Sequence, residues 1–505
     1  MLSIIKSGGT IGVEGYVVDV EVNISQGLPQ FITVGLPDTA VKESRERVKS
    51  AIINIGITFP LKKITVNLAP ADIVKQGTLY DLPIAVGILS GSGIIDDKNL
   101  KKFAFIGELA LNGNLRNVKG ILPIALELQK RGFKSFIVPK GNEKEAALVE
   151  GLNVYGFENI KEIVEFLNGE IKKEPVKLKT DQLFNLKNFS VGDFSDVKGQ
   201  YNVKRALEIA ASGFHNVLMI GSPGSGKTML ARRLISILPP LSFEEAIEVT
   251  KIHSVAGVLK DFIVRERPFR APHHTISDIA LIGGGSYPKP GEVSIAHNGI
   301  LFMDEFPEFK RTVLEVLRQP LEDKVVSISR ASGRFEFPAK FQLIAAANPC
   351  PCGYKNDPNK ECTCSPNEIK RYLGKLSGPL LDRIDISVSV MPVKPEELSK
   401  MESGESSDKI RERVLKAVEI QRKRFKDYPI NFNGEMSAPM IERFVKLEPE
   451  AENILNVSAK KFGFTARSYH RILKVSRTIA DLEESKNVKS KHIIEAINYK
   501  ISENF

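Results

Sequence analysis

The residues best suited to chemistry form a glycine-rich loop near the middle of the chain. The loop begins at Gly221, ends at Lys227 and Thr228, and fits the pattern G-x-x-x-x-G-K-[ST]. Its glycines let backbone N–H groups point at phosphates, Lys227 supplies a charge for the β- and γ-phosphates, and the Thr228 hydroxyl binds Mg²⁺. The sequence therefore predicts a nucleoside triphosphate site made of Gly221, Ser222, Pro223, Gly224, Ser225, Gly226, Lys227 and Thr228.

Apolar, strand-like runs place further polar residues beside this loop. Val217–Ile220 precedes the loop and a helical segment follows it, an order not expected of a chance glycine-rich turn. A second run, Ile300–Met303, ends at Asp304 and Glu305. Since ligands lie at the carboxyl edge of an open α/β sheet, we expect Asp304 to hold Mg²⁺ and Glu305 to polarise the attacking water. The pair predicts hydrolysis, although alone it would equally fit a strand that ends in solvated acids.

Two more polar residues follow apolar runs. A third strand-like run ends at Asn348, whose amide can orient the attacking water against the γ-phosphate. Arg383 stands among apolar residues, from where it could reach the γ-phosphate of a neighbouring subunit and stabilise transition-state charge. An ion pair within the chain, with Asp382 or Asp385, explains Arg383 equally well, and the residues alone leave both interpretations open.

A central α/β domain must position these residues. Residues 196–395 alternate strand-like runs with helical segments, the pattern of a doubly wound parallel sheet. Residues 1–170 mix strand-like and helical runs and predict an α+β domain, and the lysine-rich residues 171–195 predict a linker. Residues 396–505 read as helices, which we expect at residues 409–425, 438–447, 450–461, 466–484 and 490–501.

The composition favours an anionic partner without deciding it. The chain has 505 residues and a formal net charge of +10, which a lysine-rich solvated surface explains as well as DNA binding does. We find no apolar run long enough to cross a bilayer and no signal-peptide pattern. The expectation is a cytoplasmic protein with no membrane partner.

The four cysteines of the chain lie close together in the sequence as two C-x-C pairs, Cys350 with Cys352 and Cys362 with Cys364. In a reducing compartment such a cluster is more often a metal site than a pair of disulfides. Four thiolates can form a closed tetrahedral zinc site, although C-x-C is tighter than the usual C-x-x-C. Zinc is the favoured interpretation, and reduced free thiols are the alternative.

The order of these motifs resembles that of AAA+ ATPases, which have a P-loop core followed by a C-terminal helical lid. More narrowly, the chain resembles the magnesium-chelatase-like ATPases of the YifB/ComM family over essentially its whole length. The stretches that carry the resemblance are FMDE (302–305), AAANP (345–349), LLDR (380–383), DVKGQ (196–200), FRAPHH (269–274), NPCPCGY (348–354) and SYHRIL (468–473).

This resemblance implies roles that the spacing does not show. Asn348 would be sensor 1, Arg383 the arginine finger and Arg467 sensor 2, with Arg471 as the nearby rival. ATP and Mg²⁺ would be the cofactors and a homo-oligomeric, hexameric ring the assembly. DNA would be the partner, because better-characterised family members resemble motors that drive branch migration of recombination intermediates.

Residues 1–170 resemble the Lon-protease-like (ribosomal S5 type) domain shared with the RadA recombination protein, on IGELALNGN (106–114) and IVPK (137–140). Lon chemistry needs a serine nucleophile and a lysine base. Residues 77–83 have no serine where the nucleophile is expected, and the expected lysine falls near Leu122. The catalytic dyad is therefore predicted to be absent, and the domain to serve binding or assembly.

Two insertions in the central domain are candidates for contact with DNA. In the first, residues 253–291, the family places a pore-facing loop; its two adjacent histidines are disfavoured as metal ligands because such neighbours usually point apart. The second, residues 325–340, reads as a β-hairpin with Arg330 and Arg334 at its tip. A ring of such hairpins would offer guanidinium groups to phosphates, whereas the alternative is an exposed hairpin with ordinary charged residues.

Together these features favour an ATP-hydrolysing ring motor, a DNA translocase or branch-migration helicase. The alternative is a protein-remodelling or chelatase-subunit-like ATPase. The RadA-like domain, the basic charge and the lack of a metal-ion-dependent adhesion domain favour DNA. Glu305, Asn348 and Arg383 argue against a third possibility, a scaffold that binds nucleotide without hydrolysing it.

Overall fold

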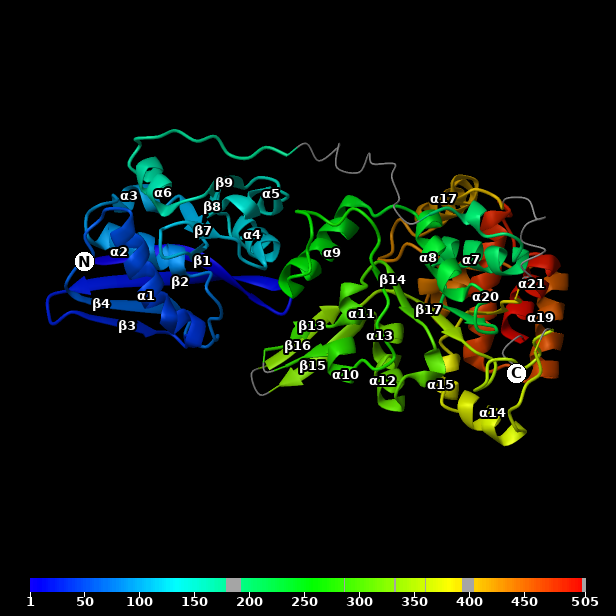
Figure 1. The fold of residues 1–505 in the computed structure, drawn as a ribbon. Coiled ribbons are helices and arrows are strands. Elements are labelled where there is room, and N and C mark those ends of the chain that lie inside the picture. Colours follow the sequence, from blue (N-terminus) through cyan, green and yellow to red (C-terminus); the bar gives the residue numbers. More distant parts are fainter. Residues whose placement is uncertain (179–191, 286, 331–332, 359, 393–403, 502–505) are drawn as a thin grey trace. The chain divides into compact units, whose positions relative to one another are not determined.

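The computed structural model describes residues 1–178, 192–285, 287–330, 333–358, 360–392 and 404–501 (Figure 1). Internal contacts divide the chain into two compact units. Unit 1 contains Met1–Leu186, Phe243–Arg265 and Ala331–Glu336, and unit 2 contains the rest. No described helix is both long and apolar enough to cross a membrane.

Unit 1 is built on a seven-stranded mixed sheet. Its strands follow the order β3 (Gln30–Val34), β4 (Lys63–Ala69), β2 (Glu14–Ser25), β1 (Leu2–Ile11), β5 (Phe103–Phe105), β8 (Ser135–Pro139) and β9 (Asn153–Phe157). The first two strands of the chain form a long antiparallel pair, and β5, β8 and β9 are parallel. Buried and less buried residues alternate along β2 and β4, as expected where only one face of a sheet is deeply covered.

Helices cover this sheet. The main ones are α1 (Thr39–Asn54), α2 (Asp81–Gly91), α4 (Ile121–Lys130) and α6 (Ile160–Leu167), with the short α3 (Asp97–Leu100) and α5 (Glu143–Ala146). Nearly every residue of α2 is buried, because its sequence is apolar on all sides and it packs on β1 and β2.

A helix from the middle of the chain also belongs to unit 1. This helix, α9 (Phe243–Ala256), packs against α4. The backbone N–H of Gly120 donates to Ser254 Oγ at 3.0 Å, and Ser254 Oγ donates to Glu145 at 2.5 Å. Lys251 forms an ion pair with Glu14 at 2.7 Å. The sequence did not predict this placement, since α9 directly follows the elements of the P-loop.

Unit 2 contains a five-stranded sheet in which every paired neighbour is parallel. The strand order is β11 (Phe269–Arg270), β14 (Ile300–Met303), β17 (Gln342–Ala347), β10 (Val217–Ile220) and β18 (Ile386–Ser389). The three central strands are buried along their whole length, which explains their uninterrupted apolar runs. The prediction of a parallel α/β sheet is confirmed.

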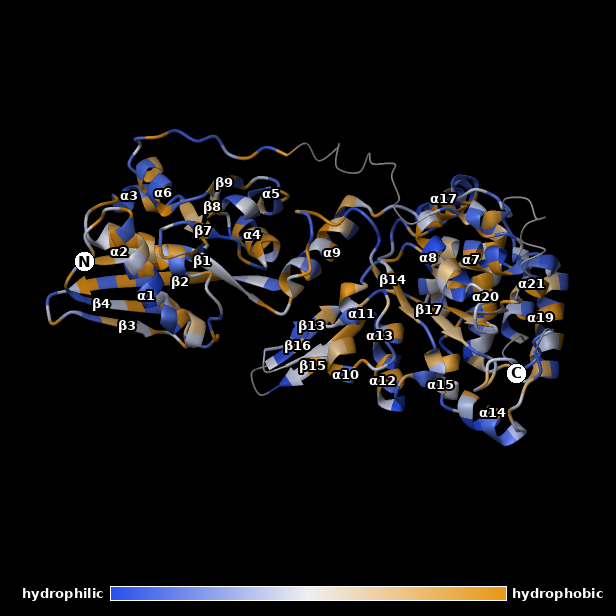
Figure 2. Cartoon of the chain, in the orientation of Figure 1, coloured by the Kyte–Doolittle hydropathy of each residue, from blue (hydrophilic) through white to orange (hydrophobic). Residues whose placement is uncertain are grey.

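Helices of the same unit pack on this sheet and on one another. Two precede or follow β10, namely α7 (Tyr201–Gly213) and α8 (Lys227–Ile237). The C-terminal ones are α17 (Ser407–Arg424), α18 (Ala438–Phe444), α19 (Pro449–Phe462), α20 (Ala466–Leu482) and α21 (Ser490–Ile501). Their apolar faces join the sheet in one core. In Figure 2 the strands are hydrophobic, and the helices around them have one hydrophobic and one hydrophilic side. Each C-terminal helix begins and ends within three residues of its predicted bounds.

The two predicted insertions carry short elements. Between β11 and β14 lie α10 (Asp278–Ile282), β12 (Gly283–Gly284), β13 (Lys289–Pro290) and α11 (Glu292–Ile295). Between β14 and β17 lie α12 (Arg311–Val316), α13 (Arg318–Asp323), β15 (Val325–Arg330) and β16 (Gly333–Pro338). The last two strands form a separate two-stranded sheet, as the hairpin pattern predicts, and residues 331–332 lie outside the described part.

Candidate nucleotide site

The predicted P-loop joins β10 to α8 at the carboxyl edge of the sheet. Gly224 and Gly226 have φ angles of +79° and +92°, in the left-handed region that glycine adopts without strain. The Lys227 ammonium group donates to the carbonyl oxygen atoms of Gly221 at 2.6 Å and Ser222 at 3.0 Å. Burial lowers the pKa of Lys227, while the charges of nearby Asp304 and Glu305 oppose that effect.

The residues predicted to bind Mg²⁺ and to orient water lie at the same edge. Thr228 Oγ1 donates to Asp304 Oδ2 at 2.7 Å, so the two predicted Mg²⁺ ligands from different elements are in direct contact. Lys227 Nζ lies 3.3 Å from Asn348 Oδ1. Because β10, β14 and β17 are adjacent parallel strands, the residues that follow them converge at one site.

Glu305 has a partner that the sequence did not predict. His274 Nδ1 lies 3.0 Å from Glu305 Oε2. The pairing of β11 with β14 carries the segment after Arg270 past the end of the neighbouring strand. The His273 and His274 rings lie with their centroids 4.1 Å apart, so the expectation that they point apart is wrong. No spacing rule would have found this contact, which depends on strand pairing.

Arg383 lies in a different part of unit 2. Its guanidinium group donates to the carbonyl oxygen of Pro379 at 2.6 Å and forms an ion pair with Glu322 of α13. Neither of the two neighbouring aspartates considered from the sequence is this partner. Arg467 Nη2 also approaches Glu322, at 3.9 Å. One carboxylate therefore faces both Arg383, which the resemblance implies is the arginine finger, and Arg467, which it implies is sensor 2.

These arginines line a cavity of about 440 Å³. Further basic residues in its lining are Lys324, Arg471 and Lys474. Burial lowers the pKa of Lys324 and lowers that of Lys474 to about 8. Arg467 and Arg471 line this cavity together with Arg383, and no residue of the P-loop is in its lining. The two candidate sensor 2 arginines therefore lie beside Arg383 and not beside the P-loop of the same chain.

Asp385 is a buried carboxylate in the lining of this cavity. Burial alone would raise the pKa of Asp385, but the charges of Arg471 and His215 hold it well below its usual range. Arg471 donates to Asp385, and also to the carbonyl oxygen of Arg383 at 3.1 Å. Arg471 is thus tied to its own chain, whereas the Arg467 side chain is 59% exposed and better placed to meet a ligand.

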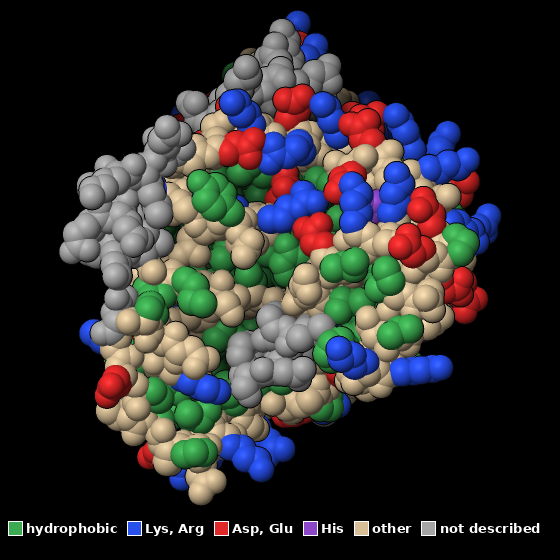
Figure 3. Space-filling model, turned by 90° about the vertical axis from the view of Figure 1, so that its right-hand side faces the viewer, with side chains coloured by type: hydrophobic (Ala, Val, Ile, Leu, Met, Phe, Trp, Pro, Cys, Tyr) green, Lys and Arg blue, Asp and Glu red, His purple; other side chains and the backbone are tan. Residues whose placement is uncertain are grey.

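The candidate DNA contacts lie on the surface. Arg330 ends β15 and Arg334 lies near the start of β16, and both residues are exposed. Arg334 forms an ion pair with Glu336 at 2.9 Å. On the face of the protein shown in Figure 3, Lys and Arg side chains lie among Asp and Glu side chains, so the net positive charge is not gathered there.

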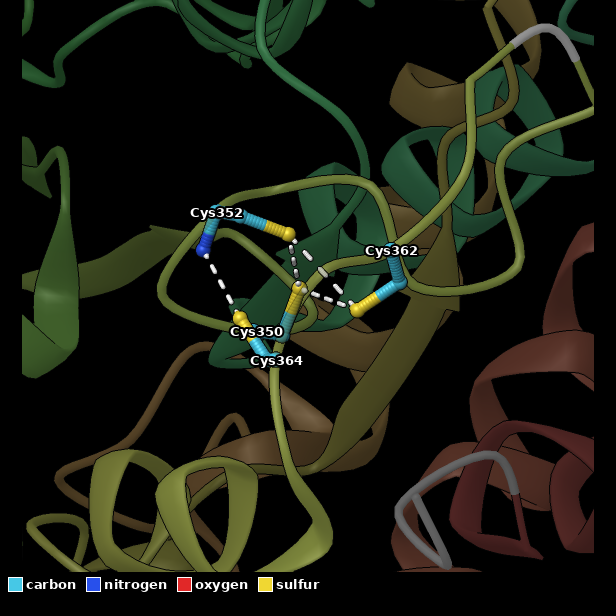
Figure 4. Close-up of side chains that lie close together, drawn as sticks. All are labelled: Cys350, Cys352, Cys362 and Cys364. Atoms are coloured by element: carbon cyan, nitrogen blue, oxygen red, sulfur yellow. Dashed lines mark hydrogen bonds between the residues drawn. The ribbon is translucent and has the colours of Figure 1, made fainter.

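The four cysteines come together, as the sequence predicts. Their sulfur atoms all lie within 4.8 Å of one another, and all four cysteines are free (Figure 4). The cluster lies in the loop between β17 and α14 (Pro366–Leu373), close after Asn348.

Comparison with known proteins decides the family. Family models described as "Subunit ChlI of Mg-chelatase", "Magnesium chelatase, subunit ChlI" and "Magnesium chelatase, subunit ChlI C-terminal" match residues 20–142, 193–398 and 404–500. The competence protein ComM of Haemophilus influenzae is 45% identical over 503 residues, which cover 99% of this chain and 97% of that protein. The chain belongs to the YifB/ComM family of AAA+ ATPases.

Other relatives of this YifB/ComM family member extend the comparison. The uncharacterised protein YifB of Escherichia coli is 44% identical over 503 residues, covering 99% of this chain and 97% of that protein. An uncharacterised MCM-type protein of Methanocaldococcus jannaschii is 26% identical over 395 residues, covering 71% of this chain and 48% of that protein. The family match agrees with ATP and Mg²⁺ as the cofactors of an AAA+ ATPase.

Proposed function

We propose that this chain forms an ATP-hydrolysing hexameric ring that moves DNA as a translocase or branch-migration helicase. The observation that carries the proposal is the separation of two half-sites within unit 2. The P-loop with Asp304, Glu305 and Asn348 forms one, and the cavity lined by Arg383 and Arg467 forms the other.

The first half-site supplies the groups for binding and activation, and no arginine is among them. Lys227 and the backbone of the P-loop hold the phosphates, and Thr228 with Asp304 holds Mg²⁺. Glu305 takes a proton from the attacking water, and Asn348 orients that water. Charge that develops on the γ-phosphate needs a further cation, and an arginine supplied by a neighbour can contribute a large part of the rate.

The second half-site supplies that cation to the next subunit. A nucleotide phosphate would replace Glu322 as the partner of Arg383 and Arg467, because a guanidinium group binds phosphate and carboxylate in the same fork geometry. In this arrangement the ATPase site of a single subunit is incomplete. Subunits that repeat one heterologous contact, each giving its arginines to the next, can close into a ring.

DNA is the proposed substrate because Arg330 and Arg334 are exposed on the hairpin, where guanidinium groups can meet phosphates without reading sequence. One relative is a competence protein and another is an MCM-type protein, which agrees with a DNA motor. In this proposal residues 1–170 are a Lon-protease-like binding module without the proteolytic dyad, 171–195 a linker, 196–395 the ATPase core and 396–505 a helical lid. The protein acts in the cytoplasm.

The deciding experiment measures the ATPase rate of the full chain without DNA and with single strands, duplex and a four-way junction. A DNA motor should hydrolyse ATP faster on at least one of these. If the rate is the same on all of them, the DNA proposal fails and the protein-remodelling function takes its place.

A further inference from the structure

The cysteine cluster has the geometry of a mononuclear metal site. The sulfur of Cys350 lies 3.4 Å from that of Cys352 and 3.6 Å from that of Cys362, and the sulfurs of Cys352 and Cys362 are 3.6 Å apart. A tetrahedral zinc ion with Zn–S bonds of about 2.3 Å separates its sulfur ligands by about 3.8 Å. A disulfide bond is about 2.05 Å long, so no disulfide joins these sulfur atoms.

The loop backbone supports thiolates at the same place. The backbone N–H of Cys352 donates to Cys364 Sγ at 3.3 Å, and that of Lys355 donates to Cys350 Sγ at 3.3 Å. Such outer contacts orient metal ligands. In Figure 4 the sulfur atoms of Cys350, Cys352 and Cys362 point toward one another. An iron–sulfur cluster fits less well, since its cysteines bind different iron atoms and cannot all lie within 4.8 Å.

The same loop is built against the nucleotide site. The Ser222 hydroxyl of the P-loop donates to the Asp357 carboxylate, which lies between the two cysteine pairs. A Cβ atom added to Gly353 would lie only 2.6 Å from Cδ of Pro223, so the loop backbone packs directly on the P-loop. The loop begins at Asn348, which contacts Lys227. The cysteine loop therefore touches the P-loop at two points and carries the sensor residue at its base.

We propose that Cys350, Cys352, Cys362 and Cys364 bind one Zn²⁺ ion, and that this ion holds Gly353 and Asp357 against the P-loop so that nucleotide binding and turnover depend on it. The dependence of turnover rests on the proposed ATPase function. The described residues between the cysteine pairs form no helix or strand that would fix the shape of the loop. A cross-link through four thiolates replaces that missing constraint, as structural zinc does in small metal-stabilised loops.

The first test measures zinc in the purified full chain by elemental analysis. About one Zn²⁺ per chain is expected. Cys362→Ser should lose the zinc, whereas the matched variant Glu361→Gln, one position away on an exposed side chain, should keep it. Wild-type protein without zinc whose four thiols titrate freely would overturn the proposal.

The second test asks whether the ion acts on the nucleotide site. Zinc is released from folded wild-type protein with a mercurial, and the affinity for a fluorescent ADP is measured before release, after release, and after thiol recovery with added Zn²⁺. Affinity should fall about tenfold and then return, because the Ser222 contact with a charged acceptor is lost and regained. Unchanged affinity after release would refute the coupling.

Asp357→Ala separates the metal from its effect. This variant should keep its zinc yet bind the fluorescent ADP about as weakly as zinc-free protein. Full affinity in this variant would also refute the coupling through Asp357. Zinc content and ADP binding require no hydrolysis, so their outcome is independent of whether the chain proves to be a DNA-stimulated ATPase.

Discussion

Replacing His274 tests the most specific contact that the structure adds to the nucleotide site. His274 Nδ1 lies 3.0 Å from Glu305 Oε2, and the ring is held by His273 and by an edge-on contact with Phe309 at 6.4 Å. Glu305 itself has a φ of +52°, an uncommon conformation for a residue other than glycine. We therefore expect His274 to be a positioning residue that fixes the carboxylate of the proposed base.

The size of the effect follows from exposure. The His274 side chain is 33% exposed and the Glu305 side chain 53% exposed, so solvent screens their interaction. Contacts of this kind contribute at most about 1 kcal/mol, and a loss of that size in the transition state lowers kcat about fivefold. Because His274 contacts the base and not the P-loop, the KM for ATP should stay unchanged.

The assay is steady-state ATP hydrolysis by His274→Ala with the wild-type chain as reference. His274→Asn provides the matched control, since its amide can still donate to Glu305 and should recover part of the lost rate. Two results would refute the reasoning: a kcat equal to or above that of the wild type, or a change confined to KM.

Three other variants test the rest of the site. Glu305→Gln should still bind ATP but stop turnover, because it removes the base and keeps the Mg²⁺ ligand; turnover at the wild-type rate would disprove the assignment. Arg383→Ala subunits should bind ATP yet be inactive alone. Mixing them with Lys227→Ala subunits should restore some hydrolysis, because an intact nucleotide pocket can then meet an intact arginine from its neighbour. A mixture as inactive as its components would argue against action between subunits. Replacing both Arg330 and Arg334 with alanine should weaken binding to all DNA sequences alike and leave basal ATP hydrolysis intact. The salt dependence of DNA affinity should fall by the equivalent of up to about two phosphate contacts. A double variant that moves a junction at the normal rate would exclude the hairpin from DNA movement.

The sequence predicts well whatever depends on local order along the chain. The P-loop, Asp304 and Asn348 each follow an apolar run, and parallel strands bring the residues after them to one edge. The C-terminal helices were also predictable, because each has its own apolar periodicity and stop signals. The clustering of the four cysteines was predictable as well, because all four lie in one short segment of the chain, and their sulfur atoms do lie close together.

Contacts between segments that are far apart in the chain could not be predicted from the sequence. The partner of Arg383 is Glu322, a residue 61 positions away that sits in no recognised motif. The two aspartates beside Arg383 in the chain were natural candidates, but Asp385 is committed to Arg471. His274 and Glu305 likewise meet only because β11 pairs with β14, and no pattern in either segment names the other.

Helix α9 changes how unit 1 relates to the ATPase core along the chain. The chain leaves the sheet of unit 2 after α8, contributes Phe243–Arg265 to unit 1, and returns directly to β11. Unit 1 is therefore bound covalently to the core by this excursion as well as by the linker, and residues 1–170 alone lack one of its packed helices. The buried Ser254 of α9 donates to Glu145, and burial raises the pKa of that carboxyl group, so removing α9 would take away one of its hydrogen-bond donors. Since α8 begins at Lys227 and β11 leads to His274, both connections of α9 come from segments that contact the nucleotide site.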